Sequence, residues 1–280
     1  YISCNLADDN NLDGHLLPGL DPKGIPRGLK GSSIPFEYNK IEQLRKIIEE
    51  NEIGVIVLEP FRNNLPEDDF VGEVRKIADE TGAVLIFDEI TCGWRNNLGG
   101  IHLDWNINPD IVVYAKAISN GYPMSAILGK KNVMDSAQDT FISSTSWTER
   151  VGPCAAIATI KKLRDKKGPE HIAKIGKLID LGWNKLAKKH DVDIEVHGPF
   201  SLVGFEFKGD DTLSTLFTQE MLKRGFLAGM SVYVSLSHTE EHVEKYLNAV
   251  DEVFELIANT NNPKSLLEGP VAYSGFKRLT

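Results

Sequence analysis

Short apolar runs alternate with amphipathic stretches along the first half of the chain. Three apolar runs rich in β-branched residues predict strands at 54–60, 83–89 and 110–116, and another apolar segment follows at 125–129. Helical spacing predicts helices over 39–51, capped by Asn39, and over 67–82, ended by Gly82. Strands that alternate with helices in this way are typical of a mostly parallel sheet with helices on both faces. We therefore expect an α/β fold.

The second half of the chain has longer helical patterns and one alternating stretch. The alternation at 193–209 predicts paired strands, and helices are predicted at 149–166, 169–190, 211–224 and 239–259. This mixture is typical of a smaller α+β domain. We place the boundary near Lys167, which assigns residues 1–166 to a large domain and 167–280 to a small one. Residues 1–38, rich in Gly, Pro, Asn and Asp, predict a long surface loop.

The composition is that of an ordinary soluble globular protein, with 41% hydrophobic and 25% charged residues. A formal charge of −9 argues against a nucleic-acid or anionic-membrane partner, because such binding normally shows as a basic excess. Cys4, Cys92 and Cys154 lie far apart without CxxC spacing, which disfavours a disulfide framework or a structural zinc site. No apolar run is long enough to span a bilayer. We expect a cytoplasmic protein.

Three polar residues stand where the predicted strands end, namely Glu59, Asp88 and Lys116. Ligands of parallel sheets bind beyond the carboxyl ends of the strands. Asp88 and Lys116 are about one crossover unit apart, so neighbouring strands can bring both to one crevice. A lysine there can form a Schiff base, and an aspartate can hold a protonated ring nitrogen. Together they suit pyridoxal phosphate.

A run of hydroxyl side chains precedes the helix predicted to begin near Thr148 or Glu149. Helix N-termini present free amides to phosphate, so this run is a candidate phosphate site. The run consists of Ser143, Ser144, Thr145 and Ser146. Hydroxyls at this place are also ordinary helix caps, and the residues alone leave both interpretations open.

Several long motifs in register carry a resemblance to a known family. "LEP", "VLIFDEITCGWR", "NPDIVVYAKAISNGYPMSAILG" and "TERVGPCAAIATI" resemble the class III aminotransferases of the fold-type-I pyridoxal-phosphate enzymes. The tail "SVYVSLSHTEEHVEKYLNAVDEVFE" is similar to the glutamate-1-semialdehyde aminomutase branch. The resemblance runs from about Gly54 to Phe254. It implies pyridoxal phosphate as cofactor, a small amine or carbonyl substrate, and a homodimer with shared active sites.

The resemblance also implies a role for each matching residue. Lys116 would carry the internal aldimine and then move the proton between the substrate and the cofactor. Asp88 would bind the pyridinium nitrogen, and Ile90 would pack against the ring. Thr145 or Ser146 would reach the phosphate of the neighbouring subunit's cofactor.

Supporting positions and departures complete the expected site. Glu59, in the family's "EP" turn, would support the site from behind, and Asn64 matches the aminomutase-like branch. Thr91 stands where many members have Gln, so the contact to the cofactor's 3-hydroxyl is lost or remade. Family members run well over a hundred residues further at the N-terminus, where a phosphate loop and a stacking aromatic lie. We therefore expect this chain alone to bind the cofactor poorly.

The same residues also allow other interpretations. The main alternative to a class III aminotransferase or aminomutase is a non-catalytic fragment or interaction domain that keeps the fold. "HTEEH" at 238–242 matches an inverted zinc-peptidase pattern, but Thr239 is a better N-cap, with His238 before the helix. His102 belongs to no constellation that we can use. Arg95 and Arg150 are candidates for a substrate carboxylate, or for surface pairing.

Overall fold

A computed structural model gives the structure of residues 24–61, 64–208 and 211–272. The chain divides into two compact units, one of Tyr1–Glu52 with Pro270–Thr280 and the other of Ile53–Gly269. Cys4 and residues 1–23 of the predicted N-terminal loop lie outside the described residues. The described part of that loop holds only the short 3-10 turn η2 (Arg27–Leu29) as regular structure.

The helix α2 (Ile41–Glu50) confirms the first predicted helix, but its cap differs from the prediction. Lys40 is the N-cap and makes no side-chain cap hydrogen bond. Asn39 has a left-handed φ of 63°, which asparagine tolerates better than most residues. The predicted Asn39 cap is therefore wrong, because this residue turns the chain one position before the cap.

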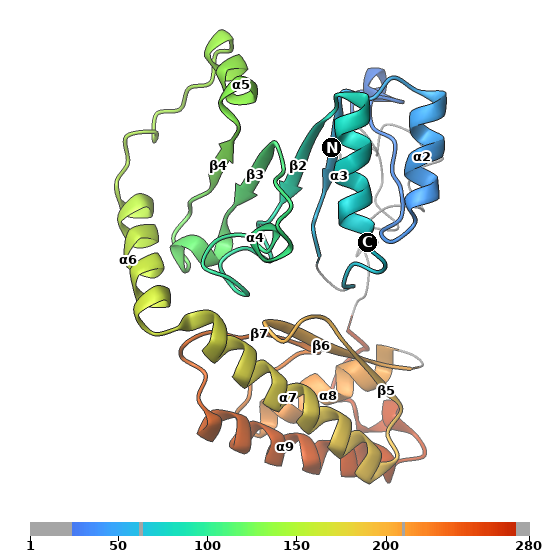
Figure 1. Cartoon of the computed structure of the whole chain (residues 1–280). Coiled ribbons are helices and arrows are strands. Elements are labelled where there is room, and N and C mark those ends of the chain that lie inside the picture. Colours follow the sequence, from blue (N-terminus) through green and yellow to red (C-terminus); the bar gives the residue numbers. More distant parts are fainter. Residues whose placement is uncertain (1–23, 62–63, 209–210, 273–280) are drawn as a thin grey trace. The chain divides into compact units, whose positions relative to one another are not determined.

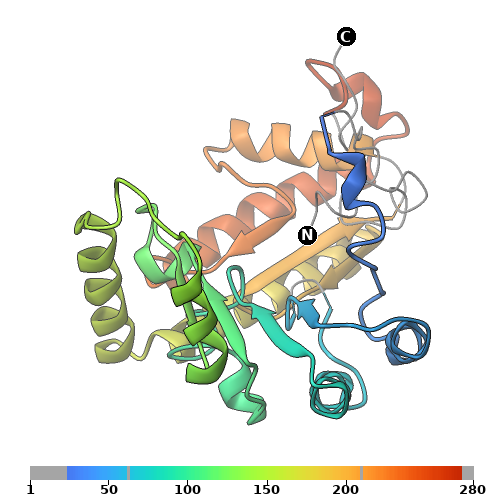
Figure 2. The same ribbon diagram turned by 90° about the horizontal axis from the view of Figure 1, so that it is seen from above.

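A four-stranded sheet with the order β1-β2-β3-β4 forms the first part of the larger unit. Its strands are β1 (Val55–Leu58), β2 (Val84–Asp88), β3 (Ile111–Tyr114) and β4 (Ala126–Gly129). The first three strands pair in parallel, and β4 pairs antiparallel with β3. The colour change from blue to green follows this order in Figure 2. The predicted mostly parallel α/β sheet is confirmed.

One face of this sheet is buried, and the other is more open. Leu85 and Phe87 are fully buried, whereas Ile86 and Asp88, which alternate with them along β2, are only partly buried. The helix α3 (Phe70–Thr81) packs against β2 and ends at Gly82, whose φ is 73°, as predicted. Since side chains alternate along a strand, Asp88 shares the more open face with Ile86.

The rest of the larger unit begins with short elements around the strand ends. They are α4 (His102–Trp105), η3 (Lys116–Ser119), α5 (Lys131–Met134) and η4 (Asp135–Asp139). Longer helices and a second sheet follow: α6 (Val151–Asp165), α7 (Gly168–His190), β5 (Ile194–His197), β6 (Leu202–Phe207), α8 (Asp211–Lys223), β7 (Ser231–Tyr233), α9 (Glu240–Ala258) and η5 (Pro263–Leu266). The strands are antiparallel in the order β5-β6-β7, which confirms the predicted pairing within 193–209.

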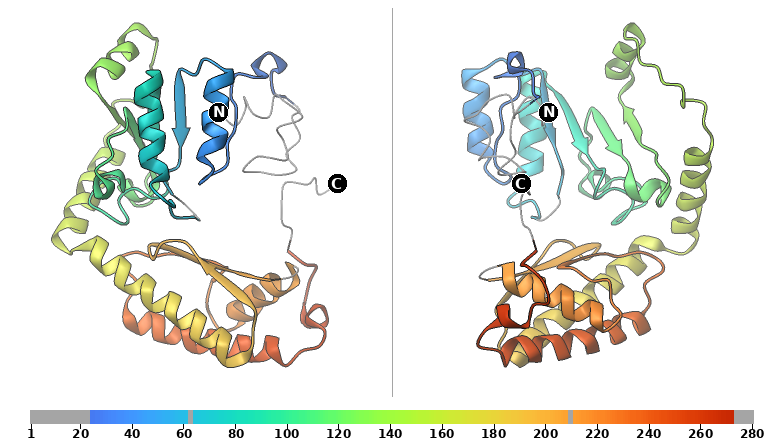
Figure 3. Two further views of the ribbon diagram at one scale, coloured as in Figure 1. Left: turned by 45° about the vertical axis from the view of Figure 1, so that its right-hand side comes forward. Right: turned by 180° about the vertical axis from the view of Figure 1, so that it is seen from behind.

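Aromatic side chains fill the core of this α+β part. The rings of Trp183 and Phe205 meet edge to face at 4.8 Å, and Phe205 meets Phe217 at 5.3 Å. Helices α7 and α9 lie side by side across this core (Figures 1 and 3). All members of the buried core cluster fall between Leu163 and Ile257. Residues 53–269 form one compact unit, so the boundary near Lys167 stays a prediction.

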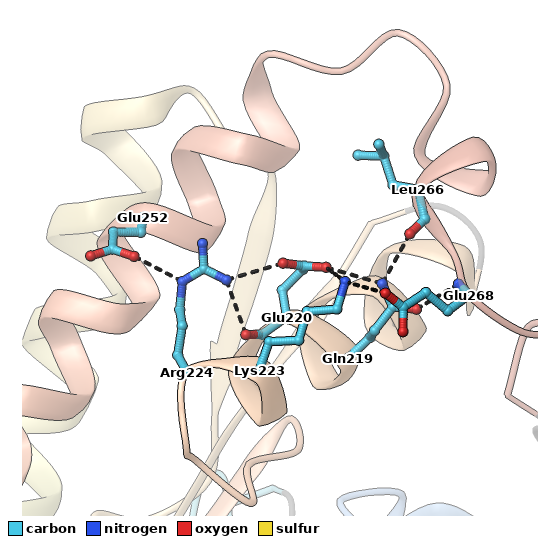
Figure 4. Close-up of polar contacts among 7 residues, drawn as sticks. All are labelled: Gln219, Glu220, Lys223, Arg224, Glu252, Leu266 and Glu268. Carbon is cyan, nitrogen blue, oxygen red and sulfur yellow. Dashed lines mark hydrogen bonds and ion pairs between the residues drawn. The ribbon is translucent and has the colours of Figure 1, made fainter.

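Glu220 on α8 is the centre of a polar network that joins three elements (Figure 4). It is 8% exposed, and its carboxylate contacts Lys223 Nζ at 2.8 Å and Arg224 Nη1 at 3.0 Å. Arg224 also pairs with Glu252 of α9, and Lys223 with Glu268 after η5. Two cations thus compensate one buried carboxylate and tie α8 to its neighbours.

Thr239 caps α9, as the sequence predicted. Its side chain accepts the backbone N–H of His242, and His242 Nδ1 accepts the backbone N–H of Thr239. His238 lies before the helix and accepts from the backbone N–H of Ser235 through Nδ1. The HTEEH segment is therefore a helix start with a reciprocal cap.

Candidate active site

The carboxyl ends of three parallel strands gather the predicted polar residues at one edge of the sheet. Glu59 directly follows β1, Asp88 is the last residue of β2, and Lys116 opens η3 just after β3. Strands β2 and β3 are hydrogen-bonded neighbours, with Asp88 opposite Val113. The expectation that neighbouring strands bring Asp88 and Lys116 to the same edge agrees with this register.

Lys116 has an uncommon backbone conformation for a residue with a side chain. Its φ is 49°, in the left-handed region. Such residues cluster at functional sites, because the surrounding structure must offset their conformational cost. The Nζ donates to Thr91 Oγ1 at 2.9 Å. The ammonium group from the end of β3 thus reaches the loop that follows β2.

Asp88 has one carboxylate oxygen fixed by the protein and one that is available. Its Oδ1 accepts the backbone N–H of Ile90 at 3.0 Å. Within the described part of the chain, no protein donor reaches Oδ2. Asp88 is partly buried, so a positively charged donor at Oδ2 would meet weak competition from water.

Thr91 is 3% exposed and connects two cationic side chains. Its hydroxyl accepts from Lys116, and its carbonyl oxygen accepts from Arg95 Nε at 2.8 Å. The sequence predicted that a threonine here loses or remakes a contact to the cofactor. The structure assigns its hydroxyl to the lysine, a partner that the sequence did not suggest.

Sequence reasoning missed a buried pair next to Asp88. Glu89 is fully buried, its Oε2 accepts the backbone N–H of Ile101 at 2.8 Å, and its Oε1 lies 2.6 Å from His102 Nδ1. The prediction that His102 belongs to no constellation is therefore wrong. The sequence contained a signal for this pair. Alternation along the strand places position 89 on the buried side with Phe87, and a buried carboxylate needs hydrogen-bond donors nearby. The pair fastens the start of α4 to the end of β2.

Three further predicted site residues lie on exposed segments of the chain. Thr145 and Ser146 lie in an exposed turn, and α6 begins at Val151, slightly later than the predicted start. Asn64 is also exposed. Among the described residues, no hydrogen bond joins these three side chains to the group formed by Lys116, Asp88 and Thr91.

The described residues contain no cluster of three or more His, Cys, Asp or Glu side chains that could hold a metal ion. No described helix combines the length and the apolar character needed to cross a membrane. The groups that the structure brings to the sheet edge are the amine of Lys116, the carboxylate of Asp88 and the hydroxyl of Thr91.

Comparisons with known proteins agree with this arrangement. The sequence model of the family "Aminotransferase class-III" matches residues 26–254. The chain belongs to the class-III aminotransferase family. A glutamate-1-semialdehyde 2,1-aminomutase of Clostridium botulinum (strain Eklund 17B / Type B) is 30% identical over 85% of this chain and 64% of its own length. The enzyme named glutamate-1-semialdehyde 2,1-aminomutase 1 of Staphylococcus carnosus is 28% identical over 85% of this chain and 61% of its own length.

Solved structures of other proteins share the fold of this class-III member. The FumI protein of Sphingopyxis sp. MTA144, in its PLP internal aldimine form, has a TM-score of 0.79 and 26% identity, covering 84% of this chain and 59% of its own. An omega-transaminase from Sphaerobacter thermophilus has a TM-score of 0.76 and 20% identity, with 87% and 61% covered. This class-III chain spans less than two thirds of the length of these proteins.

Proposed function

We propose that this protein moves an amino group with pyridoxal phosphate as its cofactor, and that Lys116 holds the cofactor. The observation that carries the proposal is the left-handed Lys116 at the end of β3, with its Nζ held by the loop that begins at Asp88. Membership of the class-III aminotransferase family supports the same reaction class.

The residues at the sheet edge fit this cofactor. When bound, pyridoxal phosphate supplies an aldehyde that condenses with amines and a pyridine ring that withdraws electrons from the adjoining carbon. Lys116 Nζ is the amine that would hold it. Asp88 Oδ2, which has no donor in the described chain, would accept the proton-bearing ring nitrogen. Ile90 keeps Asp88 oriented through its backbone and would offer its side chain to the ring.

The same lysine would also move the proton. Once released by a substrate amine, Nζ would act as a base that takes a proton from the substrate carbon and gives it to the carbon of the cofactor's aldehyde group. Thr91 Oγ1 would orient Nζ for this step, as it does in the present structure. Glu59 and Asn64, which follow β1, would support the site from the neighbouring strand end.

We further propose a homodimer in which one subunit completes the site of the other. Thr145 or Ser146 would bind the phosphate of the partner's cofactor, because both lie in an exposed turn beside large apolar side chains. Phe141 is 98% exposed and Trp147 is 67% exposed on the same segment. An exposed apolar segment of this kind is expected at a protein interface.

The narrower proposal is a reaction like that of the glutamate-1-semialdehyde aminomutases, on a small amine or carbonyl substrate. It rests on the names of the most similar relatives reported above. We propose the cytoplasm as its location, which agrees with the free thiols of Cys92 and Cys154.

The test is borohydride reduction of the protein with pyridoxal phosphate, followed by peptide mass spectrometry. We expect the reduced cofactor to be attached to Lys116. In Lys116→Ala, both the adduct and the turnover should be lost. Asp88→Asn is expected to keep the adduct but to lose most of the rate. Modification of another lysine, or turnover that survives Lys116→Ala, would reject the assignment and leave a non-catalytic fragment as the better description.

A further inference from the structure

The turn between β7 and α9 contains two histidines that use the same ring nitrogen in the same way. Nδ1 of His238 accepts the backbone N–H of Ser235 at 3.1 Å, and Nδ1 of His242 accepts the backbone N–H of Thr239 at 3.3 Å. A neutral imidazole accepts a hydrogen bond at one nitrogen, whereas an imidazolium donates at both. Both bonds therefore exist only while the two rings are neutral.

The two bonds lie at successive points of the turn. Ser235 is also bound through its carbonyl oxygen, which accepts the backbone N–H of His238 at 3.1 Å, so ring and backbone together close the segment from 235 to 238. The bond between Thr239 and His242 is one half of the reciprocal cap of α9. Protonation would therefore remove one acceptor from the turn and one from the start of the helix.

A third histidine touches the same turn through a bond that does not depend on its charge. Nε2 of His171, near the start of α7, donates to the carbonyl oxygen of His238 at 2.8 Å. A protonated imidazole can donate in the same way. Acid would therefore loosen the turn without removing its contact with α7.

The surroundings of His238 favour the neutral ring. Burial lowers the pKa of His238, and the charges of His242 and His171 lower it further. A backbone contact with Ser235 acts in the opposite direction but does not outweigh them. A group whose pKa is lowered by the folded structure stabilises that structure at higher pH, and the stabilisation is lost as the pH falls.

Carboxylates near the turn keep their charge while the histidines titrate. Glu240 faces His171, and Glu241 faces His242. Each carboxylate has a lysine partner that lowers its pKa, so both are ionised well below the range in which histidine changes its charge. The change in charge at mildly acidic pH therefore comes from the imidazoles. The charged groups around them are Lys174 on α7 and Glu240, Glu241 and Lys245 on α9.

The turn directly follows the strand that contacts the loop of the proposed site. Strand β7 ends at Tyr233, and its ring centre lies 5.1 Å from Arg95 Cζ. Arg95 Nε in turn donates to the carbonyl oxygen of Thr91, whose hydroxyl binds Lys116. A change in the turn would thus act on a strand end that packs beside the site.

We propose that the β7–α9 turn, residues 234–242, is an acid-sensitive switch. It is closed while His238 and His242 are neutral, and it opens when both imidazoles are protonated, which frees the end of β7 beside the proposed site. The opening takes place within about pH 7 to pH 5, where histidine changes its charge. This inference does not depend on the proposed amino-transfer function.

The experiment is hydrogen exchange with mass spectrometry on the full chain, at about pH 7.5 and about pH 5. Protection is compared, after correction for the intrinsic pH dependence of exchange, between a peptide covering 231–243 and a reference peptide within α8. We expect protection of 231–243 to fall about 3- to 10-fold at the lower pH, which corresponds to the loss of a hydrogen bond. The α8 peptide should not change.

Two substitutions remove the titration but keep the acceptors. The side-chain oxygen in His238→Asn and in His242→Gln can accept the same N–H, and glutamine is a usual partner in a capping box. The double variant should lose the acid response. His197→Gln is the control, because His197 lies on β5 with Nε2 3.8 Å from Glu206, and it should respond as wild type does.

A second measurement tests the switch in wild type alone. Nitrogen chemical shifts of the histidine rings report which nitrogen carries the proton, and we expect the proton on Nε2 of His238 and His242 at neutral pH. The loss of protection should follow the protonation of these rings. A proton on Nδ1 of His238 at neutral pH, no loss of protection in acid, an equal loss in α8, or an acid response that persists in the double variant would each overturn the inference.

Discussion

Lys116 and Trp94 both have left-handed backbones, with φ values of 49° and 62°, on the two loops that form the proposed site. Neither residue type favours that region, so the surrounding contacts must hold it. Trp94 packs against Tyr114 with ring centres 6.0 Å apart, and Lys116 is bound to Thr91. At the scale of single residues, the site therefore depends on side-chain contacts that keep unfavourable backbone angles in place.

Gly100 offers a test of the packing behind Asp88. A Cβ atom at this position would lie 2.3 Å from His102 Nδ1 and 2.4 Å from Glu89 Oε1. Gly100→Ala should therefore push the buried pair apart and lower the free energy of unfolding by about 1–3 kcal/mol in urea denaturation. Cofactor binding should weaken in the same variant, because the pair holds the loop that follows Asp88.

Gly54→Ala is the matched control. A Cβ there meets nothing within 4 Å. Its unfolding free energy should be unchanged or higher by up to about 1 kcal/mol. If Gly100→Ala were as stable as this control, the Glu89–His102 pair would not be tightly packed.

At the scale of elements, Asp110 joins a helix to the strands at the edge opposite the proposed site. Its Oδ2 accepts from Leu85 N at 2.7 Å and from Arg75 Nη1 at 2.9 Å, and its Oδ1 lies 2.8 Å from Lys130 Nζ. Burial acts to raise the pKa of Asp110, but these three donors outweigh it and lower the pKa to about 2. The carboxylate thus stabilises the contact between α3 and the sheet.

The depressed pKa of Asp110 predicts a pH dependence of stability. A group with a lowered folded-state pKa stabilises the protein above its unfolded pKa, and the effect disappears as pH falls through the folded value. The free energy of unfolding of wild type should exceed that of Asp110→Asn by about 2 kcal/mol near neutral pH. This difference should shrink between about pH 4 and pH 2. Urea unfolding at several pH values measures it. A difference that stays constant down to pH 2 would contradict the assignment.

Glu220 on α8 is a second buried carboxylate with a lowered pKa (Figure 4). Burial acts to raise its pKa, but hydrogen bonds from Lys223, Gln219 and Arg224 outweigh it, so the net shift is downward. Glu220→Gln should lower the free energy of unfolding by about 1.5–3 kcal/mol, because two cations lose their buried partner. Chemical denaturation checks this value.

Glu241→Gln is the control for Glu220, because Glu241 also pairs with a cation at i+4. The partner is Lys245, but both side chains are exposed, at 71% and 64%. Exposed pairs of this kind contribute little, so Glu241→Gln should leave the free energy of unfolding close to that of wild type. Equal effects of the two variants would show that burial gives Glu220 no special importance.

At the scale of the whole molecule, the exposed segment before α6 predicts how two subunits associate. Phe141→Asp places a charge on a side chain that is 98% exposed, in the segment proposed as the interface. It should shift the protein from dimer to monomer in light scattering with size-exclusion chromatography. Cofactor affinity should fall with it, since Thr145 or Ser146 is proposed to complete the partner's site.

Leu227→Asp is the control for this prediction. Leu227 is 96% exposed but lies between α8 and β7, outside the proposed interface. This variant should keep the oligomeric state of wild type. If Leu227→Asp dissociated the dimer and Phe141→Asp did not, the interface would have to be assigned to the α+β part of the chain.

The sequence predicted most elements because their signals are local. Short apolar runs located the strands of the first sheet, alternation located the pair within 193–209, Gly82 ended α3, and Thr239 capped α9. Asn39 was predicted wrongly, because a cap requires a particular backbone conformation as well as a suitable residue type. The strand-end positions of Asp88 and Lys116 were also predictable, since they follow from where each strand stops.

By itself, the sequence determined the α/β class, the succession of elements and the family resemblance, all of which depend on residue type and spacing along the chain. Only the tertiary structure decided that Thr91 holds Lys116, that Glu89 pairs with His102, and that Arg95 lies over Tyr233. These pairs join residues that are distant in the sequence or on different elements. Their energies depend on separation in space and on burial, and only the folded chain fixes both.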